Sequence, residues 1–449
     1  MPRKIRASPF RAGVSPMARR AGEVNVGLLG LGVVGSGVAA FLLESSGSIS
    51  KKMGLPVVLK KVLVLDPDKP RDPAIPGSLI TTNPEELMAA PDIDVVVEVM
   101  GGEEPTTEYM TRALSSGKHV VTANKEVMAK HGPYLLALAR SSRVNLLFEA
   151  SVGGGIPIIG SLMSQLLAND VRSIRSIING TTNYILTRMA HDHAEFQQAL
   201  EEAQQHGYAE ADPTNDVDGI DAMYKLCILA SLAFHRRVAP QDVFCQGITM
   251  LKPQDFRYAD ELGYAIKSLA IATQDNGRIQ ARVYPALLPK DHMLAKVDGV
   301  YNAVEVNGDL CGQVLFHGRG AGREPTTSAV VGDLLEIIRR IVQNGPPLQA
   351  LEMDPAPVIQ SIDDLESRYY LRLNVADQSG VLGQIARILG EEDISLAAVL
   401  QKDTNLEAQT AEIVITTHAA REASVQRSLQ RVSELSVVGE VSSLLRIEE

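Results

Sequence analysis

The segment Ala203–Lys225 concentrates side chains that can hold or transfer protons. Its carboxylates lie within a dozen positions: Glu210, Asp212, Asp216, Asp218 and Asp221. Lys225 follows Asp221 by four positions, and residues at this spacing share one face of a helix. The run LCILASLAF after Lys225 is almost wholly apolar, which predicts a helix that is buried on most sides. Burial of a lysine at the start of such a helix lowers its pKa toward the range useful for proton transfer.

Two other interpretations of this segment are a solvated acidic loop with an exposed ion pair and a calcium-binding loop. Thr214, Asp216, Asp218 and Gly219 fall near positions 1, 3, 5 and 6 of an EF-hand loop. Position 12 of that loop requires glutamate, but Lys225 stands there. A cation at this position repels calcium, so the calcium interpretation is excluded.

The segment resembles the motif of homoserine dehydrogenases, which ends in D-P-x-x-D, an aliphatic residue and x-G-x-D-x-x-x-K. The fixed positions of the motif are filled by Ala203, Gly207, Tyr208, Ala209, Asp212, Pro213, Asp216, Val217, Gly219, Asp221 and Lys225. This resemblance implies NAD(P)-dependent interconversion of L-homoserine and L-aspartate 4-semialdehyde, the committed step toward threonine, isoleucine and methionine. It implies that the nicotinamide supplies a hydride and that Lys225, held by Asp221, donates a proton to the developing alkoxide.

The resemblance also assigns roles to residues elsewhere in the chain. It implies substrate contacts from Glu210, Asp216, Asp221, Lys125 and Thr181, with Gly180 beside them. It places Lys125, Gly207 and Gly322 against the cofactor. For Lys125 the plain alternative is an exposed lysine at a helix start.

A second constellation is the G-x-G-x-x-G sequence that follows the strand-like run VNVGLLG and opens a helix. Its members are Gly30, Leu31, Gly32, Val33, Val34 and Gly35. Glycines here let the backbone approach a pyrophosphate, which the helix N-terminus stabilises, so the sequence predicts dinucleotide binding. Asp66, at the end of the second strand-like run, favours NAD through a ribose hydroxyl. Lys60, Lys69 and Arg71 are nearby candidates for a 2′-phosphate, so NAD and NADP both remain open.

Glu149, followed by SVGGGI, resembles the alkali-cation site of the same family. The resemblance implies that Glu149 and the carbonyl oxygens of Val152, Gly154 and Ile156 hold a monovalent cation, Na⁺ or K⁺. An all-oxygen shell suits a hard cation. Without the resemblance, this stretch is a glycine-rich turn.

Strand-like and helix-like segments alternate from Val24 onward, which predicts α/β architecture: a Rossmann-like, doubly wound parallel sheet. An α+β catalytic and dimerisation domain and a C-terminal ferredoxin-like domain follow. The run TTNYILTRMAHDHAEFQQALEEAQQHG reads as one long helical stretch. The expected boundaries are 1–22 for a basic extension, 23–150 for the NAD(P)-binding domain, 151–316 for the catalytic domain, 317–343 for a segment returning to the NAD(P)-binding domain, 344–366 for a proline-rich linker and 367–449 for the C-terminal domain.

The C-terminal region has the element order β-α-β-β-α-β and resembles an ACT domain, a module that binds amino acids. Asp377, Gly380 and Val381 match its D-x-x-G-V turn, and the resemblance places an effector, threonine, near them. Such domains pair across subunits, which implies a homodimer or homotetramer. Because the linker separates the two parts, truncation near Asp364 is expected to leave an active enzyme that ignores threonine.

Composition narrows the class of protein. A net charge of −11 argues against a nucleic-acid partner, and no uncharged apolar run is long enough to span a membrane. The three cysteines lie far apart, which fits a reducing cytoplasm. They also disfavour a phosphorylating semialdehyde dehydrogenase, which needs a cysteine nucleophile and a base. A catalytically dead amino-acid sensor is the non-enzyme alternative, and the intact Lys125, Asp221 and Lys225 argue against it.

Overall fold

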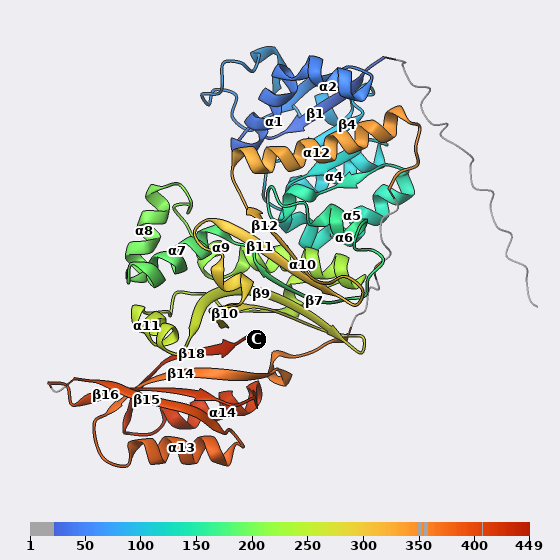
Figure 1. Cartoon of the computed structure of the whole chain (residues 1–449). Helices are drawn as coiled ribbons and strands as arrows, with labels where there is room; N and C mark the ends of the chain where they lie inside the picture. The colour runs from blue at the N-terminus through green and yellow to red at the C-terminus, as the bar shows by residue number, and fades with distance from the viewer. Residues whose placement is uncertain (1–21, 349–352, 354–357, 406) are drawn as a thin grey trace, which may run out of the picture.

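The computed structural model describes residues 22–348, 353, 358–405 and 407–449, so most of the basic extension 1–22 lies outside the described residues. Three parts stack along one direction, with the N-terminal sheet at the top of Figure 1, a mixed sheet in the middle and the C-terminal domain at the bottom. This arrangement confirms the predicted fold class. Within the described residues no single helix is long and apolar enough to cross a membrane, although α1 (Val33–Glu44) and α2 (Ser46–Met53), bent by 73°, reach that length and composition together.

The N-terminal part is a parallel sheet in the order β3-β2-β1-β4-β5-β6. Its strands are buried apolar runs, as expected when helices cover both faces of a sheet. They comprise β1 (Val24–Leu29), β2 (Val57–Leu63), β3 (Ile80–Thr81), β4 (Val95–Glu98), β5 (His119–Thr122) and β6 (Leu146–Leu147). The connecting helices include α1 (Val33–Glu44), α2 (Ser46–Met53), α4 (Thr106–Ser115) and α5 (Lys125–Ser142). The strand order reverses between β1 and β4, and ligands bind at such a point in open α/β sheets.

Helix α12 (Arg323–Val342) returns to this part from far along the chain and lies beside α1 in Figure 1. Val330, Leu334, Ile337 and Ile338 join the same buried cluster as the strand residues of β1. At Gly37 an added Cβ would lie 2.2 Å from the Thr327 hydroxyl, so only glycine permits this close helix packing.

The middle part is an antiparallel arrangement that carries α10. Its strands comprise β7 (Val171–Ile177), β9 (Tyr264–Asp275), β10 (Arg278–Pro289), β11 (Tyr301–Gly308) and β12 (Gly312–Arg319). The helices around them are α7 (Gly180–His191), α8 (Phe196–Gln205), α10 (Ile220–Phe234) and α11 (Pro253–Glu261). The prediction of one long helical stretch here was wrong, because His193 adopts a φ of 52° and divides it into α7 and α8.

The C-terminal part has the predicted element order: β14 (Glu366–Ala376), α13 (Val381–Glu391), β15 (Leu396–Asn405), β16 (Thr410–Thr417), α14 (Glu422–Ser433) and β18 (Val438–Ile447). Its sheet is continuous with the middle sheet, because β18 pairs in parallel with β10 through Ala286 and Leu287. In Figure 1 the C-terminus lies between the two parts. Buried ion pairs cross the same junction, including Arg372 with Asp255 at 2.8 Å and Arg282 with Glu448 at 3.2 Å.

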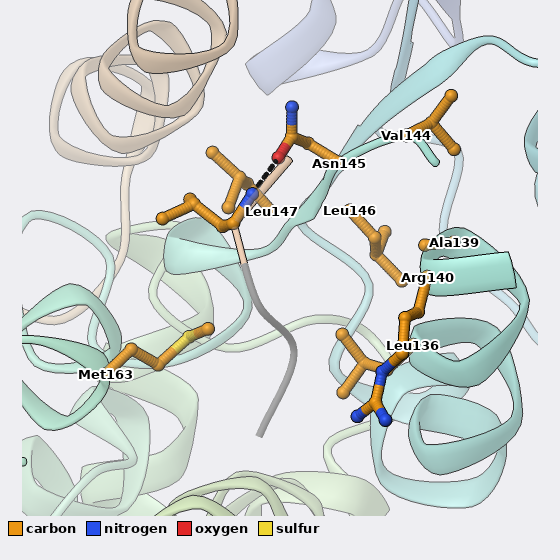
Figure 2. Close-up of a pocket in the computed structure, with 9 residues that line it drawn as sticks. Leu136, Ala139, Arg140, Val144, Asn145, Leu146, Leu147 and Met163 are labelled. Carbon is orange, nitrogen blue, oxygen red and sulfur yellow. Dashed lines mark hydrogen bonds between the residues drawn. The ribbon is translucent and has the colours of Figure 1, made fainter. Parts of the chain in front are cut away.

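The described portions of the proposed linker 344–366 lie against the core, while residues 349–352 and 354–357 are outside the described residues. Leu348 donates its backbone N–H to the Asn145 side chain at 2.8 Å. Figure 2 shows Asn145 beside apolar residues of α5 and β6. The cavity there is about 10 Å³, close to the space of one water molecule, so it is no substrate site. Further on, β13 (Val358–Ile359) pairs with β10.

Candidate functional site

Helix α10 presents Asp221 and Lys225 together, as the i,i+4 spacing predicts. Twelve of its residues are buried, which confirms the prediction of a helix covered on most sides. Gly219 precedes the helix with a φ of 83°, and an added Cβ would lie 3.0 Å from the Cys245 sulfur. Glycine is therefore required at this turn by both conformation and space.

Asp221 lies at the centre of the cluster and is only 3% exposed. One carboxylate oxygen pairs with the Lys125 ammonium, and the other accepts from Lys225 at 2.6 Å. Burial opposes the charge on this carboxylate, but attraction by Lys225 and Lys125 outweighs it and holds the pKa of Asp221 well below its usual range. Asp221 is therefore a permanent anion between two cations.

Lys225 is 9% exposed, and its ammonium donates to Asp221 and to the Ile178 carbonyl, the latter at 2.8 Å. Burial lowers the pKa of Lys225, and attraction by Asp221 only partly offsets this effect. The downward shift expected from the sequence is confirmed. An ammonium has three donors, so these two contacts leave one for a ligand.

Asn179 was missed by the sequence analysis, although it stands where β7 gives way to α7. Its side-chain nitrogen donates to Asp216 at 2.6 Å and to Asp221 at 2.8 Å. Its oxygen caps α7 by accepting from the Thr182 N–H at 2.7 Å. The asparagine preceding a helical run was a signal for the cap, but nothing local indicated the two carboxylates. Burial raises the pKa of Asp216, and the bond from Asn179 opposes this shift.

Lys125 reaches the cluster from the N-terminal sheet. Asn124 caps α5 by accepting from the Val127 N–H at 3.0 Å and donates to the Gly102 carbonyl at 2.7 Å. The Thr122 hydroxyl bonds to both the Asn124 N–H and the buried Glu98 carboxylate. This network fixes the first turn of α5 at the carboxyl ends of β4 and β5. The pKa of Lys125 is raised, because attraction by Asp221 outweighs burial.

Other residues with expected roles in binding substrate or cofactor lie in the segments around α7 and α8. The Thr181 hydroxyl donates to the Tyr208 carbonyl at 2.6 Å and ties the segment after α8 to the start of α7. Gly207 has a φ of 73° and open space where a side chain would stand. At Gly180 a Cβ would lie 2.9 Å from the Val300 carbonyl. Glu210 is exposed, and its charge contributes to the raised pKa of Lys125.

The glycine-rich turn has the geometry of a dinucleotide cradle. Gly30 has a φ of 96°, and a Cβ there would lie 2.8 Å from the Val99 carbonyl. A Cβ on Gly35 would lie 2.2 Å from the Gly30 carbonyl, whereas Gly32 faces open space. No side chain caps α1, whose first turn contains no acid. Backbone N–H groups at an open helix start suit a pyrophosphate. Leu31, Val33 and Val34 complete the turn.

Asp66 lies three positions beyond the end of β2, rather than at its end as the sequence suggested. Its carboxylate accepts from the Asp68 N–H at 2.9 Å, which shapes the turn. The Arg71 guanidinium binds the backbone carbonyls of the same turn, including that of Asp66. Lys60 instead pairs with Glu23 at 3.1 Å, away from this turn.

Glu149 lies between the N-terminal sheet and the middle part. Its carboxylate accepts from the N–H groups of Ile159 and Gly160 at 2.8 and 2.6 Å, at the start of α6 (Ile159–Met163). Its own N–H donates to Asp333 on α12 at 2.8 Å, which the sequence analysis missed. Burial raises the pKa of Glu149, and burial together with repulsion from Glu149 raises the pKa of Asp333 to about 8.

In the described part of the chain no cluster of three or more His, Cys, Asp or Glu side chains could hold a metal. The expected shell for an alkali cation differs from such a cluster, because it consists of one carboxylate and the backbone carbonyls of Val152, Gly154 and Ile156. Two adjacent, half-buried carboxyl groups without an ion-pair partner among the described residues fit a nearby cation. Gly322 precedes α12 with a φ of 121°. At Gly154 an added Cβ would lie 2.6 Å from the Gly320 carbonyl oxygen.

The predicted regulatory turn lies far from this site. Asp377 and Gly380 are exposed between β14 and α13, and Gly380 has a φ of 89°. Val381 is buried and begins α13.

Comparison with known proteins gives one consistent result. The family "Homoserine dehydrogenase" matches residues 157–335, "Homoserine dehydrogenase, NAD binding domain" matches 30–149, and "ACT domain" matches 369–436. The homoserine dehydrogenase of Synechocystis sp. is 44% identical over 94% of this chain and 99% of that protein, and the Bacillus subtilis enzyme is 40% identical over 95% and 98%.

Solved structures agree with these sequence matches. The crystal structure of a homoserine dehydrogenase from Thiobacillus denitrificans superposes with a TM-score of 0.88 at 40% identity, covering 95% of this chain and 98% of that one. A hyperthermophilic archaeal homoserine dehydrogenase in complex with NADPH gives a TM-score of 0.60 at 26% identity, covering 73% and 99%.

Proposed function

We propose that Lys225 is the general acid and base of this chain. The chain belongs to the homoserine dehydrogenase family, and it interconverts L-homoserine and L-aspartate 4-semialdehyde with a nicotinamide cofactor. The observation that carries the proposal is the buried Lys225 ammonium, with Asp221 at 2.6 Å and the Ile178 carbonyl at 2.8 Å. In the direction of reduction, the remaining N–H of the Lys225 ammonium donates its proton to the developing alkoxide. In the direction of oxidation, the neutral Lys225 amine accepts the proton of the substrate hydroxyl. When bound, the nicotinamide supplies or accepts the hydride.

Substrate recognition follows from the charges around Lys225. Asp216 and Glu210 provide anions for the ammonium of homoserine, while Lys125 provides a cation beside the reacting oxygen. Thr181 holds the Tyr208 segment in place at 2.6 Å and offers a hydroxyl to the substrate. Because Lys125 comes from the N-terminal sheet and Lys225 from α10, the substrate lies where these two parts meet.

The cofactor is held by residues 30–35, with Lys125, Gly207 and Gly322 facing it. Support comes from the open helix start at Gly32 and from the unobstructed backbone at Gly207. Asp66 favours the free ribose of NAD, whereas Lys69 and Arg71 favour the 2′-phosphate of NADP, and the archaeal relative was solved with NADPH.

Parallel assays of the purified protein with homoserine and either cofactor decide both activity and preference. Absence of turnover with both would refute the proposed catalytic roles.

An alkali cation binds beside Glu149 and the carbonyls of Val152, Gly154 and Ile156. Support comes from the half-buried Glu149 carboxylate, whose pKa is raised by burial, and from Asp333, whose pKa is raised to about 8. A cation there would reduce the repulsion between the two carboxyl groups and bridge the N-terminal and middle parts.

The ACT domain binds threonine near Asp377, Gly380 and Val381 in a cytoplasmic homodimer or homotetramer. An effector acts through unequal affinity for two states of the protein. Full-length enzyme should therefore lose activity in millimolar threonine, and Asp377→Ala should need more threonine for the same loss. Unchanged activity in threonine would mean that the domain has another ligand or a structural role.

A further inference from the structure

One buried arginine of the C-terminal domain reaches directly into the middle part. Arg446 on β18 is 1% exposed, and its guanidinium binds Glu422 of α14 at 2.5 and 3.0 Å. Its third nitrogen donates to the side-chain oxygen of Gln246 at 2.6 Å. The guanidinium also lies over the rings of Phe244 and Tyr284, which further fixes its position.

Gln246 lies in a short segment that packs on the backbone of residues 210–218, here called the acidic segment. The Ile248 N–H donates to the Val217 carbonyl at 2.9 Å, and the Cys245 thiol contacts the Asp218 carbonyl at 3.2 Å. At Gly247 a Cβ would lie 2.6 Å from the Val217 carbonyl and 2.9 Å from the Asp218 Cα. The two backbones therefore touch with no room between them.

The acidic segment leads at once into the catalytic cluster. Asp216 accepts from Asn179 at 2.6 Å, and Gly219 begins the helix that carries Asp221 and Lys225. A continuous series of contacts thus runs from α14 through Arg446 to Gln246, and from the adjoining Gly247 and Ile248 to Val217, which follows Asp216. Packed interiors shift between discrete arrangements rather than deforming smoothly. A displacement of Arg446 would therefore also displace the acidic segment.

We propose that Gln246 is a positioning residue that couples the C-terminal domain, through Arg446, to the part of the acidic segment that binds homoserine. The coupling acts on substrate affinity, because Val217 and Asp218, which the Gln246 segment contacts, directly follow Asp216. This inference rests on the proposed role of Asp216 in substrate binding.

Gln246→Met keeps the length of the side chain and removes the acceptor for Arg446. We expect the KM for homoserine to rise about tenfold, within the range of typical coupling between sites. The kcat should change less than about twofold and the KM for the cofactor should not change. Gln246→Glu retains an acceptor oxygen and should restore the KM.

Gln280 provides a matched control. It lies on β10 and also accepts from a buried arginine, Arg282, at 3.1 Å. No contact joins it to the acidic segment among the described residues. Gln280→Met should therefore leave the KM for homoserine unchanged. Equal KM values in Gln246→Met and Gln280→Met would overturn the inference, whatever their melting temperatures.

Hydrogen exchange gives a readout that does not depend on the substrate. In Gln246→Met the amides of Asp218, Gly219 and Ile248 should exchange faster than in the wild type and in Gln280→Met. Unchanged exchange at all three overturns the coupling. Faster exchange together with an unchanged KM in Asp216→Asn would instead refute the role of Asp216 and leave the contact pathway standing.

Discussion

Asp221 receives contacts from three side chains that belong to three different elements: Lys125 on α5, Asn179 before α7 and Lys225 on α10. The sequence predicted the pair with Lys225, because four positions on one helix bring two side chains together. Asn179 is separated by 42 positions, and its contact depends on how β7 and α10 pack. Local spacing therefore revealed the pair of Asp221 and Lys225 but not the other groups that contact Asp221.

Lys225→Met should lower kcat by about 10²- to 10⁴-fold, because the positioned general acid is lost while the side-chain length is kept. Cofactor affinity, followed by fluorescence titration of the reduced nicotinamide, should remain close to that of the wild type. Lys130→Met is the control, since Lys130 pairs with Glu103 and Glu126 rather than with Asp221. A kcat near that of the wild type would reduce Lys225 to a structural ion-pair partner.

Asp66→Asn tests cofactor choice without disturbing the turn, because an amide oxygen can still accept from the Asp68 N–H. Loss of the anion should raise the KM for NAD and lower the KM for NADP, since repulsion of the 2′-phosphate is removed. Steady-state kinetics with each cofactor measure the ratio. If both KM values stay the same, the Asp66 side chain does not face the ribose.

At the scale of elements, Asp333 joins α12 to the turn that begins at Glu149. Its pKa in the folded protein is about 8, whereas an unfolded aspartate titrates near about 3.9. The folded state therefore binds more protons than the unfolded state between these values, and the stability from this residue falls as pH rises from about 4 to about 8. Asp333→Asn should remove that slope in urea unfolding measured from pH 5 to 8.5. Glu324→Gln, an exposed change on the same helix, should leave it intact.

The same titration tests the proposed cation. Sodium or potassium bound beside Glu149 would favour the ionised form of Asp333 and flatten the slope in the wild type. Choline chloride at equal ionic strength should not do so. Identical slopes in sodium, potassium and choline would argue against a cation at this position, independently of any effect on turnover.

At the scale of the molecule, the C-terminal domain shares a sheet with the middle part. The sequence suggested that a cut near Asp364 would leave an active enzyme, because a proline-rich stretch precedes it. The structure leads to the opposite expectation, since the cut removes β18 and Glu448, which pairs with the buried Arg282 at 3.2 Å. Loss of one partner of a buried ion pair lowers the free energy of unfolding by about 3–5 kcal/mol.

Thermal unfolding of the truncated chain should show a clearly lower Tm, together with reduced activity. Full activity at an unchanged Tm would contradict this expectation.

The order of elements was predictable because each one has a local pattern: apolar strands, the glycine-rich turn and the apolar helix α10. The break between α7 and α8 was not predictable, because it depends on the left-handed conformation of His193 inside a helix-forming run. The pairing of β18 with β10 was also hidden, since it joins residues 160 positions apart, Ala286 and Arg446. Long-range pairing of this kind leaves no periodic signal in either partner.

The return of α12 to the first sheet also constrains how the protein is made. The ribosome releases β1 to β6 first, but the apolar face that covers α1 arrives only with residues 323–342. At about 5–20 residues per second, some 175 further residues take roughly 10–35 s to synthesise. During that interval the nascent nucleotide-binding sheet exposes the surface later buried by Val330, Leu334, Ile337 and Ile338. The growing chain therefore presents an apolar face that chaperones can bind until synthesis passes α12.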